Sequence, residues 1–414
     1  MLGGVPMPWM TEWAGPFPVF VDEAHGARFT DVDGHEYIDF CLGDTGAMTG
    51  HGPKSVVDVV AERSANGITL MLPTEDSIWV GEEMARRFGL PSWQFCLTAT
   101  DANRFTIRLA REITGRPRIL VFNWCYHGSV DETVATLTDG MVHPRKDSVG
   151  PPVDPALTTR VVEWNDLEGL ERELAHEDVA CVLTEPALTN IGIVLPEPGF
   201  HDGLRELTRR FDSYLVIDET HTICAGPGGF TRAFGLEPDF VTIGKPLASG
   251  VPAACYGMSE EVATRIQDRF DRMDITDVGG VGGTLSGNAL SLAAMRATLE
   301  HVLTEDAFTH MISLAERWTD GVKSAIDRHA LPWEVQRLGA RAEYWFCPEP
   351  PRTGGEAAAA DDNELARLLH LHALNRGILL TPFHNMALMC PDTSEDHVDA
   401  HSRAFEDIAA ELTA

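Results

Sequence analysis

Residues 214–250 read YLVIDETHTICAGPGGFTRAFGLEPDFVTIGKPLASG. The stretch contains two short apolar runs, and each run stops at charged residues. The first run ends at Asp218 and Glu219, and the second ends at Lys245. Short apolar runs bounded by turn residues are typical of strands that are buried on both faces. We therefore predict two buried strands that carry a carboxylate and an amine at their carboxyl ends.

Apolar runs alternate with helical patterns on both sides of this stretch. The runs that read as strands cover 94–98, 118–124, 179–186, 214–219, 239–245 and 253–259. The amphipathic patterns that read as helices cover 101–115, 166–177 and 199–212. Strands that alternate with helices indicate a mostly parallel sheet with helices on both faces. The predicted fold class is α/β.

The two ends of the chain have a different pattern. Near the N-terminus, DVDG at 31–34 is a turn signal between two alternating runs and predicts a β-hairpin. After about residue 286 the pattern is helical, then strand-like over 335–346, and a loop rich in Pro, Gly and Ala is expected at 348–362. We therefore predict a large domain and a smaller α+β domain built from both chain ends, with boundaries at 46–285 for the first and 1–45 with 286–414 for the second.

Composition and charge exclude several function classes. The chain has 414 residues, with 32 Lys and Arg against 63 Asp and Glu, so its formal net charge is −31. A protein with this charge repels a polyanion, and nucleic acid is not expected as a partner. The apolar runs are shorter than the roughly 20 residues of a membrane helix, so we predict no membrane association. The first residues lack a signal-peptide pattern, and we predict a cytoplasmic location. The eight cysteines have no spacing typical of a zinc site, and no metal is predicted.

Lys245 is the first candidate for chemistry. The carboxyl ends of parallel strands form the crevice in which α/β proteins bind ligands, and a lysine held there loses hydration, which favours a neutral, nucleophilic amine. Taken alone, such a lysine is more often a strand-end residue paired with a carboxylate. Asp218 favours a catalytic role for Lys245 over a structural one, because pyridoxal phosphate requires an amine and a carboxylate that face one crevice. The amine binds the cofactor's aldehyde, and the carboxylate keeps its ring nitrogen protonated.

The phosphate of such a cofactor needs backbone N–H donors, which the start of a helix supplies. The segment LTATDANRFTIRLAR has this form, with hydroxyl groups on Thr98 and Thr100 and with Asp101 at the helix start. The same residues also suit an ordinary helix N-cap. Thr284, in a glycine-rich approach to another helix, is a second candidate phosphate donor. Tyr126 is a candidate ring to cover one face of the cofactor, or else a core tyrosine.

Taken in order, these motifs resemble the class III aminotransferase family of fold-type I pyridoxal-phosphate enzymes, which includes glutamate-1-semialdehyde aminomutase. The resemblance extends from GARFTDVDGHEYIDF to NRGILLTPFHN, which is nearly the whole chain. It implies that Lys245 is the Schiff-base lysine and that Asp218 binds the ring nitrogen. It also implies cofactor contacts in the D-E-x-x-T, Y-H-G and E-P-x-x-x-N-x-G segments, here from Thr220, Tyr126, His127, Glu185 and Asn190.

The resemblance further implies a homodimer, because Thr284 matches a residue that reaches the phosphate of the neighbouring subunit. Two segments depart from the family pattern. The phosphate loop carries Ala99 where the family has glycine and Asp101 where it has glutamate, although we still expect the phosphate to bind through Thr100 and the helix N-terminus. His221 stands where methionine or glutamine is expected, and it adds a titratable group near the cofactor.

The activity implied by the resemblance is transamination. Lys245 would move a proton while an amino group passes from an amino acid or amine to a keto or aldehyde acceptor. An intramolecular aminomutase, or another reaction of the same cofactor, is the first alternative. A cofactor-binding protein without turnover is a remote one.

The donor and acceptor are the least defined part of the prediction. Arg341, Arg28 and Arg104 are candidates to bind a substrate carboxylate, although each also suits a surface salt bridge. Near the C-terminus, Phe383 and His384 stand where many relatives have an arginine. We therefore predict a donor with an aromatic or bulky group, in a pocket that could also include Trp9, Met10, Trp13 and Trp124.

Overall fold

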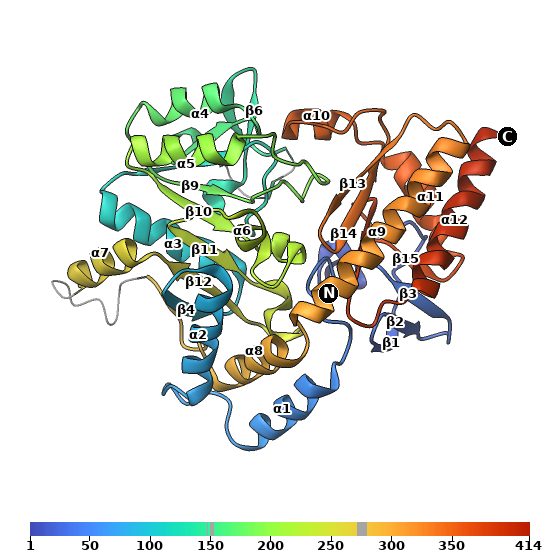
Figure 1. Ribbon diagram of the computed structural model, residues 1–414, viewed down its shortest axis with the longest axis horizontal. Coiled ribbons are helices and arrows are strands. Elements are labelled where there is room, and N and C mark those ends of the chain that lie inside the picture. The colour runs from blue at the N-terminus through green and yellow to red at the C-terminus, as the bar shows by residue number, and fades with distance from the viewer. Residues whose placement is uncertain (147, 150–152, 271–279) are drawn as a thin grey trace.

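A seven-stranded sheet forms the centre of the computed structural model, which describes residues 1–146, 148–149, 153–270 and 280–414 (Figure 1). The strand order is β4 (Ser92–Cys96), β12 (Ala254–Met258), β11 (Phe240–Ile243), β10 (Tyr214–Asp218), β9 (Val179–Thr184), β5 (Arg118–Phe122) and β8 (Thr159–Val162). Strand β12 is antiparallel to both of its neighbours, β4 and β11, and the other neighbouring pairs of this sheet are parallel. The sheet is therefore mostly parallel, as predicted.

Helices cover this sheet. They are α1 (Lys54–Ala65), α2 (Glu75–Phe88), α3 (Ala99–Thr114), α4 (Leu167–Leu174), α5 (Phe200–Arg210), α6 (Gly229–Phe234), α7 (Glu260–Phe270) and α8 (Ala289–His301). The start of α3 is fixed by Thr98, whose hydroxyl accepts a hydrogen bond from the Asp101 amide at 3.1 Å. Helix α3 packs against β9, β11 and β12, and it begins just after the carboxyl end of β4.

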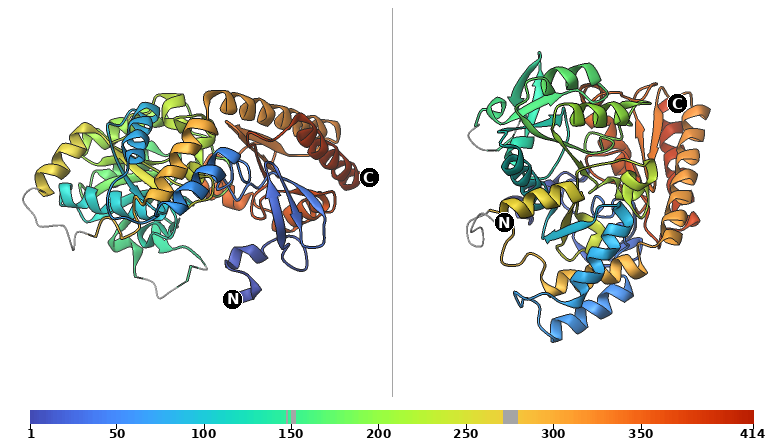
Figure 2. Two further views of the ribbon diagram at one scale, coloured as in Figure 1. Left: turned by 90° about the horizontal axis from the view of Figure 1, so that it is seen from below. Right: turned by 60° about the vertical axis from the view of Figure 1, so that its left-hand side comes forward.

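A second part of the molecule joins the two ends of the chain. Strands β1 (Val21–His25), β2 (Arg28–Asp31) and β3 (Glu36–Asp39) form a sheet with β15 (Ile378–Leu379), which pairs in parallel with β3. A second, three-stranded sheet packs against α9 (Glu305–Arg328) and consists of β13 (Glu334–Leu338), β14 (Arg341–Trp345) and β16 (Met386–Leu388). Helix α12 (Glu395–Thr413) packs against both α9 and α11 (Asn363–Leu374). Figure 2 shows these N-terminal strands beside the C-terminal helices.

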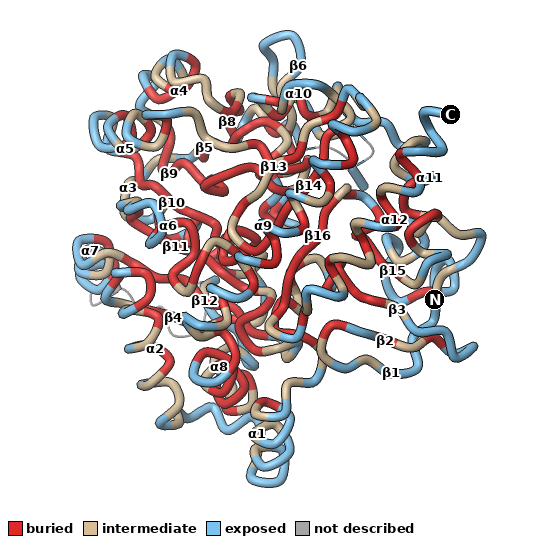
Figure 3. The backbone as a smooth tube through the Cα atoms, turned by 45° about the vertical axis from the view of Figure 1, so that its right-hand side comes forward, coloured by how far each residue is buried: buried red, intermediate tan, exposed pale blue. Residues whose placement is uncertain are grey.

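The core explains why the strands could be predicted. Every residue of β9, β10, β11 and β12 is buried, and Figure 3 shows these strands in red at the centre. A strand covered on both faces needs apolar residues at successive positions, which produces the continuous runs seen in the sequence. Burial on both faces also leaves few places for polar chemistry. The polar residues concentrate where the strands end.

Most expected elements are confirmed, including the hairpin β2–β3 around DVDG. One expectation was wrong: the loop predicted at 348–362 contains the helix α10 (Gly354–Ala359). Its start is capped by Thr353, whose hydroxyl accepts from the Glu356 amide at 3.1 Å, and its alanines favour the helix. The edge strand β8 and the hairpin of β6 (Ala135–Thr138) with β7 (Met141–Pro144) were not predicted.

The division into domains at 46–285 stays a prediction. Helix α8 begins just after that boundary and packs on α1 and α2. Within the described residues, no helix is both long and apolar enough to cross a membrane.

Candidate active site

A cavity of about 490 Å³ lies at the carboxyl ends of the central strands. Its walls come from the ends of β10 and β11, from the start of α3 and from loops at 43–47 and 250–253. The lining residues that the sequence singled out are Thr98, Ala99, Thr100, Tyr126, Glu185, Asp218, Thr220, His221 and Lys245. One cavity therefore brings together most of the predicted site.

Asp218 occupies the inner end of β10, and its carboxylate has three hydrogen-bond donors. Its Oδ2 accepts from Asn103 Nδ2 at 2.7 Å and lies 2.9 Å from His127 Nδ1, and its Oδ1 accepts from the Thr220 amide at 3.1 Å. The register of β10 with β11 places Asp218 opposite Thr242, whose hydroxyl donates to Asn103 at 2.6 Å. Asp218 is thus fixed in position by two strands and a helix.

The charge of Asp218 is stabilised as well as its position. Burial alone would raise the pKa of Asp218, but the hydrogen bond and positive charge of His127 lower it. Burial likewise opposes the charged form of His127, but the neighbouring Cys125 and Asp218 raise its pKa to about 10. The two buried side chains therefore form a carboxylate–imidazolium pair. His127 lies behind the cavity and does not line it.

Lys245 follows β11 and opens a short 3-10 helix with a positive φ of 47°. A positive φ is uncommon for a non-glycine residue, and such strained residues are concentrated at functional sites. The Lys245 Nζ lies 2.8 Å from Asp44 Oδ2 and 2.7 Å from His221 Nε2. The amine therefore has an acid on one side and an imidazole on the other.

Asp44 was not predicted from the sequence. It belongs to the loop 42–45, in which four consecutive residues have positive φ, with values of 45° for Leu42, 58° for Gly43, 50° for Asp44 and 80° for Thr45. The segment LGDTG signals a turn, but nothing in it indicates that the chain returns to Lys245, 201 positions later. The strained loop is thus a second irregular element at the Lys245 end of the cavity.

His221 connects the cavity to a buried polar cluster on β14. Its Nδ1 lies 3.1 Å from Thr45 Oγ1 and 3.2 Å from Arg341 Nη1. Burial, together with the positive charge of Lys245, lowers the pKa of His221 well below its ordinary value, so His221 is a neutral imidazole. The Arg341 guanidinium is fully buried and donates to the Thr189 carbonyl at 2.7 Å and lies 3.4 Å from Glu343.

The predicted phosphate loop also lines the cavity. Thr98 lines the cavity, but its hydroxyl is used as the N-cap of α3, which leaves the Thr100 hydroxyl and the backbone amides of this turn to bind a phosphate. Gly128, with φ 76°, packs so closely that a Cβ there would lie 2.0 Å from Thr100 Oγ1. Ala99 fits because it faces a glycine: a Cβ on Gly244 would lie 3.1 Å from Ala99 Cβ.

Several predicted residues lie elsewhere. Asn190 and Thr284 are not among the residues that line this cavity, and Thr284 instead lines a separate cavity of about 320 Å³. Arg28 lies 3.8 Å from Glu36 at the surface, and Arg104 is half-buried and donates to the Ser129 carbonyl. Glu185 does line the cavity, and burial raises its pKa.

The aromatic residues of the N-terminal segment form a neighbouring hollow. Trp9 packs edge-on against Phe383 with ring centroids 6.4 Å apart. Trp9 and Trp13 line a cavity of about 220 Å³. Gly43 lines this hollow as well as the Lys245 cavity, so the two are adjacent.

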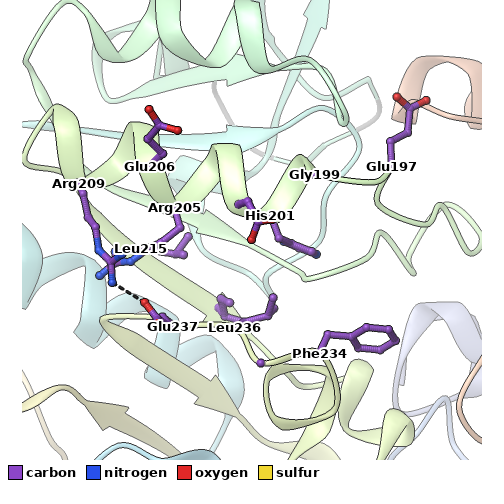
Figure 4. A pocket seen from close by; sticks show the side chains of 13 residues that line it. Glu197, Gly199, His201, Arg205, Glu206, Arg209, Leu215, Phe234, Leu236 and Glu237 are labelled. Carbon is purple, nitrogen blue, oxygen red and sulfur yellow. Dashed lines mark hydrogen bonds and ion pairs between the residues drawn. The ribbon is translucent and has the colours of Figure 1, made fainter.

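Another cavity, of about 540 Å³, lies beside α5 and α6 (Figure 4). Several of its charged side chains are held in ion pairs. Arg209 contacts Glu237 at 2.5 Å, as the dashed line in Figure 4 marks, and Arg205 binds Asp239 at 2.7 and 2.8 Å. No lysine is among the residues that line this cavity. The Lys245 cavity is therefore the candidate active site.

Comparisons with known proteins agree with the observed fold. The family model described as Aminotransferase class-III matches residues 9–408. A glutamate-1-semialdehyde 2,1-aminomutase of Neisseria meningitidis serogroup C / serotype 2a is 32% identical over 377 residues, which cover 89% of this chain and 86% of that protein.

Solved structures give the same result. A crystal structure of a glutamate-1-semialdehyde-aminomutase from Pseudomonas aeruginosa PAO1 has a TM-score of 0.97 and 53% identity, over 100% of this chain and 92% of that one. A lysine-to-alanine variant of a protein with the same description was solved in complex with PMP. An omega-transaminase from Sphaerobacter thermophilus has a TM-score of 0.86 and 26% identity, over 98% and 93% of the two chains.

Proposed function

The chain belongs to the class III aminotransferase family, and on this basis we propose that it catalyses transamination between an amino donor and a carbonyl acceptor. It is an enzyme of a pyridoxal-phosphate family, and its fold is that of the fold-type I enzymes. The observation that carries the proposal is that Asp218 and Lys245 line one cavity from the ends of two adjacent strands.

The cofactor is pyridoxal phosphate, and the residues of the cavity fit it. In our proposal, the Asp218 carboxylate would accept a hydrogen bond from the protonated ring nitrogen, Lys245 would hold the aldehyde carbon, and Thr100 with the first amides of α3 would hold the phosphate. Two buried polar atoms support the fit, because Thr220 Oγ1 and Asp44 Oδ1 have no hydrogen-bond partner among the described residues. When bound, the cofactor stabilises negative charge on the substrate carbon next to the reacting nitrogen.

Lys245 and His221 are proposed to handle the proton. Lys245 Nζ takes the proton from the substrate carbon and returns it elsewhere, which requires a neutral amine at that moment. His221 lies 2.7 Å from Nζ and is itself neutral, so it can share a hydrogen bond with the amine without adding a positive charge. His127 keeps Asp218 ionised throughout, because it lies 2.9 Å away and is charged at neutral pH.

An intramolecular aminomutase reaction is the second candidate. It is favoured by the names of the relatives, including the one that is 53% identical over the whole chain. The site chemistry of Lys245 and Asp218 serves both reactions equally. What favours separate donor and acceptor molecules is the substrate side of the cavity, which no arginine of the described residues lines.

One experiment separates the two reactions. The loaded enzyme is mixed with an amino donor in the absence of a carbonyl acceptor. A transaminase converts about one equivalent of donor per active site and then stops in the aminated form, whereas an aminomutase continues to turn over its own substrate. We expect conversion of the donor to stop after this first equivalent, and continued turnover of glutamate 1-semialdehyde would contradict the proposal.

The assembly and the location also belong to the proposal. We propose a homodimer in which Thr284 reaches the phosphate of the neighbouring subunit, because Thr284 lines a cavity that shares no residue with the Lys245 cavity in the described chain. Light scattering gives the mass of the particle, and Thr284→Val is expected to weaken cofactor binding if the dimer shares its sites. We also propose a cytoplasmic location.

A further inference from the structure

We propose that Arg341 is a positioning residue, which keeps Lys245 in its neutral, nucleophilic form by competing with it for one nitrogen of His221. Arg341 is not among the residues that line the Lys245 cavity, so its effect on the amine passes through His221. The inference rests on the proposed function, because it concerns the amine that the proposal assigns to the reaction. It gives the buried arginine of β14 a role other than binding a substrate carboxylate.

His221 lies between two nitrogen donors. Its Nε2 is 2.7 Å from Lys245 Nζ, and its Nδ1 is 3.2 Å from Arg341 Nη1. Burial above all lowers the pKa of His221 well below its ordinary value, so the ring carries a single proton. A neutral imidazole has one nitrogen that donates and one that accepts. His221 can therefore accept a hydrogen bond from Arg341 or from Lys245, but not from both.

Arg341 takes the accepting nitrogen because a guanidinium can only donate. It stays protonated in proteins and has no acceptor atom, so Nδ1 of His221 must accept and Nε2 must carry the proton. His221 then donates from Nε2 to Lys245 Nζ, which has to accept with a lone pair. A neutral amine has this lone pair, and an ammonium ion does not. The contact of 2.7 Å is therefore favourable when Lys245 is neutral.

Asp44 favours the charged form of Lys245, and its effect has to be weighed against that of Arg341. Asp44 Oδ2 lies 2.8 Å from Lys245 Nζ, and a carboxylate attracts an ammonium ion. This pair is partly solvated, because 25% of the Lys245 side chain and 21% of the Asp44 side chain are exposed. A neutral amine still donates one N–H to Asp44 while it accepts from His221. The neutral form thus keeps every contact, whereas the ammonium form turns two N–H groups toward each other at His221.

The surroundings of Arg341 hold both its position and its charge. Its guanidinium is fully buried, donates to the Thr189 carbonyl at 2.7 Å and lies 3.4 Å from Glu343. Burial alone would raise the pKa of Glu343, but the charges of His384 and Arg341 lower it. An ionised partner and a carbonyl acceptor are what a buried guanidinium needs. Arg341 therefore keeps its place whichever charge Lys245 has.

Thr45 provides the arrangement that His221 would adopt without the arginine. Its hydroxyl lies 3.1 Å from Nδ1 and can either donate or accept. Without Arg341, Nδ1 could keep the proton and donate it to Thr45, which would free Nε2 to accept from an ammonium ion of Lys245. Asp44 and His384 also face His221, but Asp44 Oδ1 lies 3.8 Å from Nδ1, beyond hydrogen-bond distance. Arg341 is thus the group that decides between the two arrangements.

The position of the proton on His221 tests the inference directly. Nitrogen-15 NMR of the full-length wild type, labelled at its histidines and free of added cofactor, distinguishes protonated from unprotonated ring nitrogens. His221→Leu identifies the signals of this residue. We expect an unprotonated Nδ1 and a protonated Nε2. A proton on Nδ1 would overturn the inference, and this result needs no variant of Arg341.

Trace labelling with acetic anhydride measures how much of each lysine is neutral, because only the amine reacts. Peptide mass spectrometry follows Lys245 over a range of pH, with the surface lysines Lys54 and Lys323 as references in the same sample. In Arg341→Met, we expect Lys245 to react about 10 times more slowly at neutral pH than in wild type, and equally fast at high pH. An unchanged rate at neutral pH would overturn the inference. So would an equal fall at every pH, because it would mean lost access to the amine.

A double variant separates competition at His221 from a general effect of the arginine's positive charge. Once His221→Leu has removed the imidazole, adding Arg341→Met should change the rate of Lys245 by less than about twofold, because the two residues act as one unit. A tenfold effect that persists without His221 would show that Arg341 acts through its charge alone. That result would overturn the inference.

Arg87 provides a matched control. It is also a buried arginine, paired with Glu83 at 2.7 Å, and it donates to the carbonyls of Leu299 and Leu303 at 2.7 and 2.9 Å. Arg87→Met should lower the free energy of unfolding but leave the labelling of Lys245 unchanged, and thermal unfolding checks that every variant is folded. No turnover is needed for these tests. If Lys245 responds to Arg341 as described but the loaded wild type transfers no amino group, the inference stands and the proposed function fails.

Discussion

The two ends of the active-site cavity are built in different ways. At one end, Asp218 sits on a regular strand, and Asn103, His127 and Thr220 give its oxygens three donors. At the other end, Lys245 lies on irregular backbone opposite the strained loop of Asp44. At the first end the Asp218 carboxylate is fixed by three donors, and at the second end Asp44 Oδ1 is a buried acceptor without a donor among the described residues. We infer that the Asp218 end holds the cofactor and that the Lys245 end handles protons and substrate.

The largest expected effect comes from Lys245→Ala. Removing the amine abolishes covalent attachment and proton transfer together, so the rate of amino transfer should fall by at least about 10⁴-fold. The absorption band of the lysine-bound cofactor, expected at about 400–430 nm, should also disappear. Stopped-flow absorbance with excess donor measures the rate. Lys323→Ala, at a surface lysine 3.5 Å from Glu334, is the control and should behave as wild type.

Asp218→Asn should have the next largest effect. The neutral amide cannot stabilise a positive ring nitrogen, and the loss of one preorganised electrostatic group slows a reaction by about 10²–10³-fold. Single-turnover rates measure this. Asp239→Asn is the matched control, because Asp239 is also a buried carboxylate, paired at 2.7 Å with Arg205, which lines the cavity of Figure 4. Asp239→Asn should lower the free energy of unfolding but leave the rate of amino transfer unchanged. If Asp218→Asn also kept a rate within tenfold of wild type, the two carboxylates would not differ in function, and Asp218 would not have the role we assign to it.

Gly128→Ala tests the wall that we assign to the phosphate. The new Cβ would meet Thr100 Oγ1, so the turn at the start of α3 must shift, and the affinity for pyridoxal phosphate should fall about tenfold. Gly140→Ala is the control: its φ is 73°, close to the 76° of Gly128, but nothing lies within 4 Å of the added Cβ. Both variants should lose about 1–2 kcal/mol of stability from the positive φ, and only the first should lose cofactor affinity. Fluorescence titration with the cofactor distinguishes them.

The pH dependence of stability gives the smallest effect. His127 has a folded-state pKa of about 10 against an ordinary value near 6.5, so its contribution to stability is complete below about pH 6.5 and is lost as the pH rises through about 10. The free energy of unfolding should therefore fall more steeply between pH 7 and pH 10 in wild type than in His127→Gln. Urea unfolding at both pH values measures the slopes. Parallel slopes would mean that the pair with Asp218 is not charged as described.

Much of the fold could be predicted because the central strands are buried on both faces. Residues 179–184 and 214–218 have no exposed position, so each strand leaves an uninterrupted apolar run in the sequence. Asp218 and Lys245 were visible for the same reason, since each is the first charged residue after such a run. Their assignment to catalysis stays a prediction until it is tested.

The remaining site residues depend on tertiary packing. Asp44 reaches Lys245 across 201 positions, and only the docking of the N-terminal segment brings them together. Asn103 left a faint signal, because it is a polar residue on a helix face that also carries Ala102 and Phe105, all three buried. The polar cluster of Arg341 and Glu343 alternates with apolar residues on β14, and the sequence showed the arginine but not its engagement.

The role of Lys245 is tested most sharply by locating the covalent bond to the cofactor. The chain has four lysines, so borohydride reduction of the loaded protein followed by peptide mass spectrometry distinguishes them. We predict that the pyridoxyl group is found on Lys245 and on no other lysine, and that Lys245→Ala carries none. A label on Lys54, Lys146 or Lys323, or none on the loaded wild type, would show that Lys245 does not bind the cofactor.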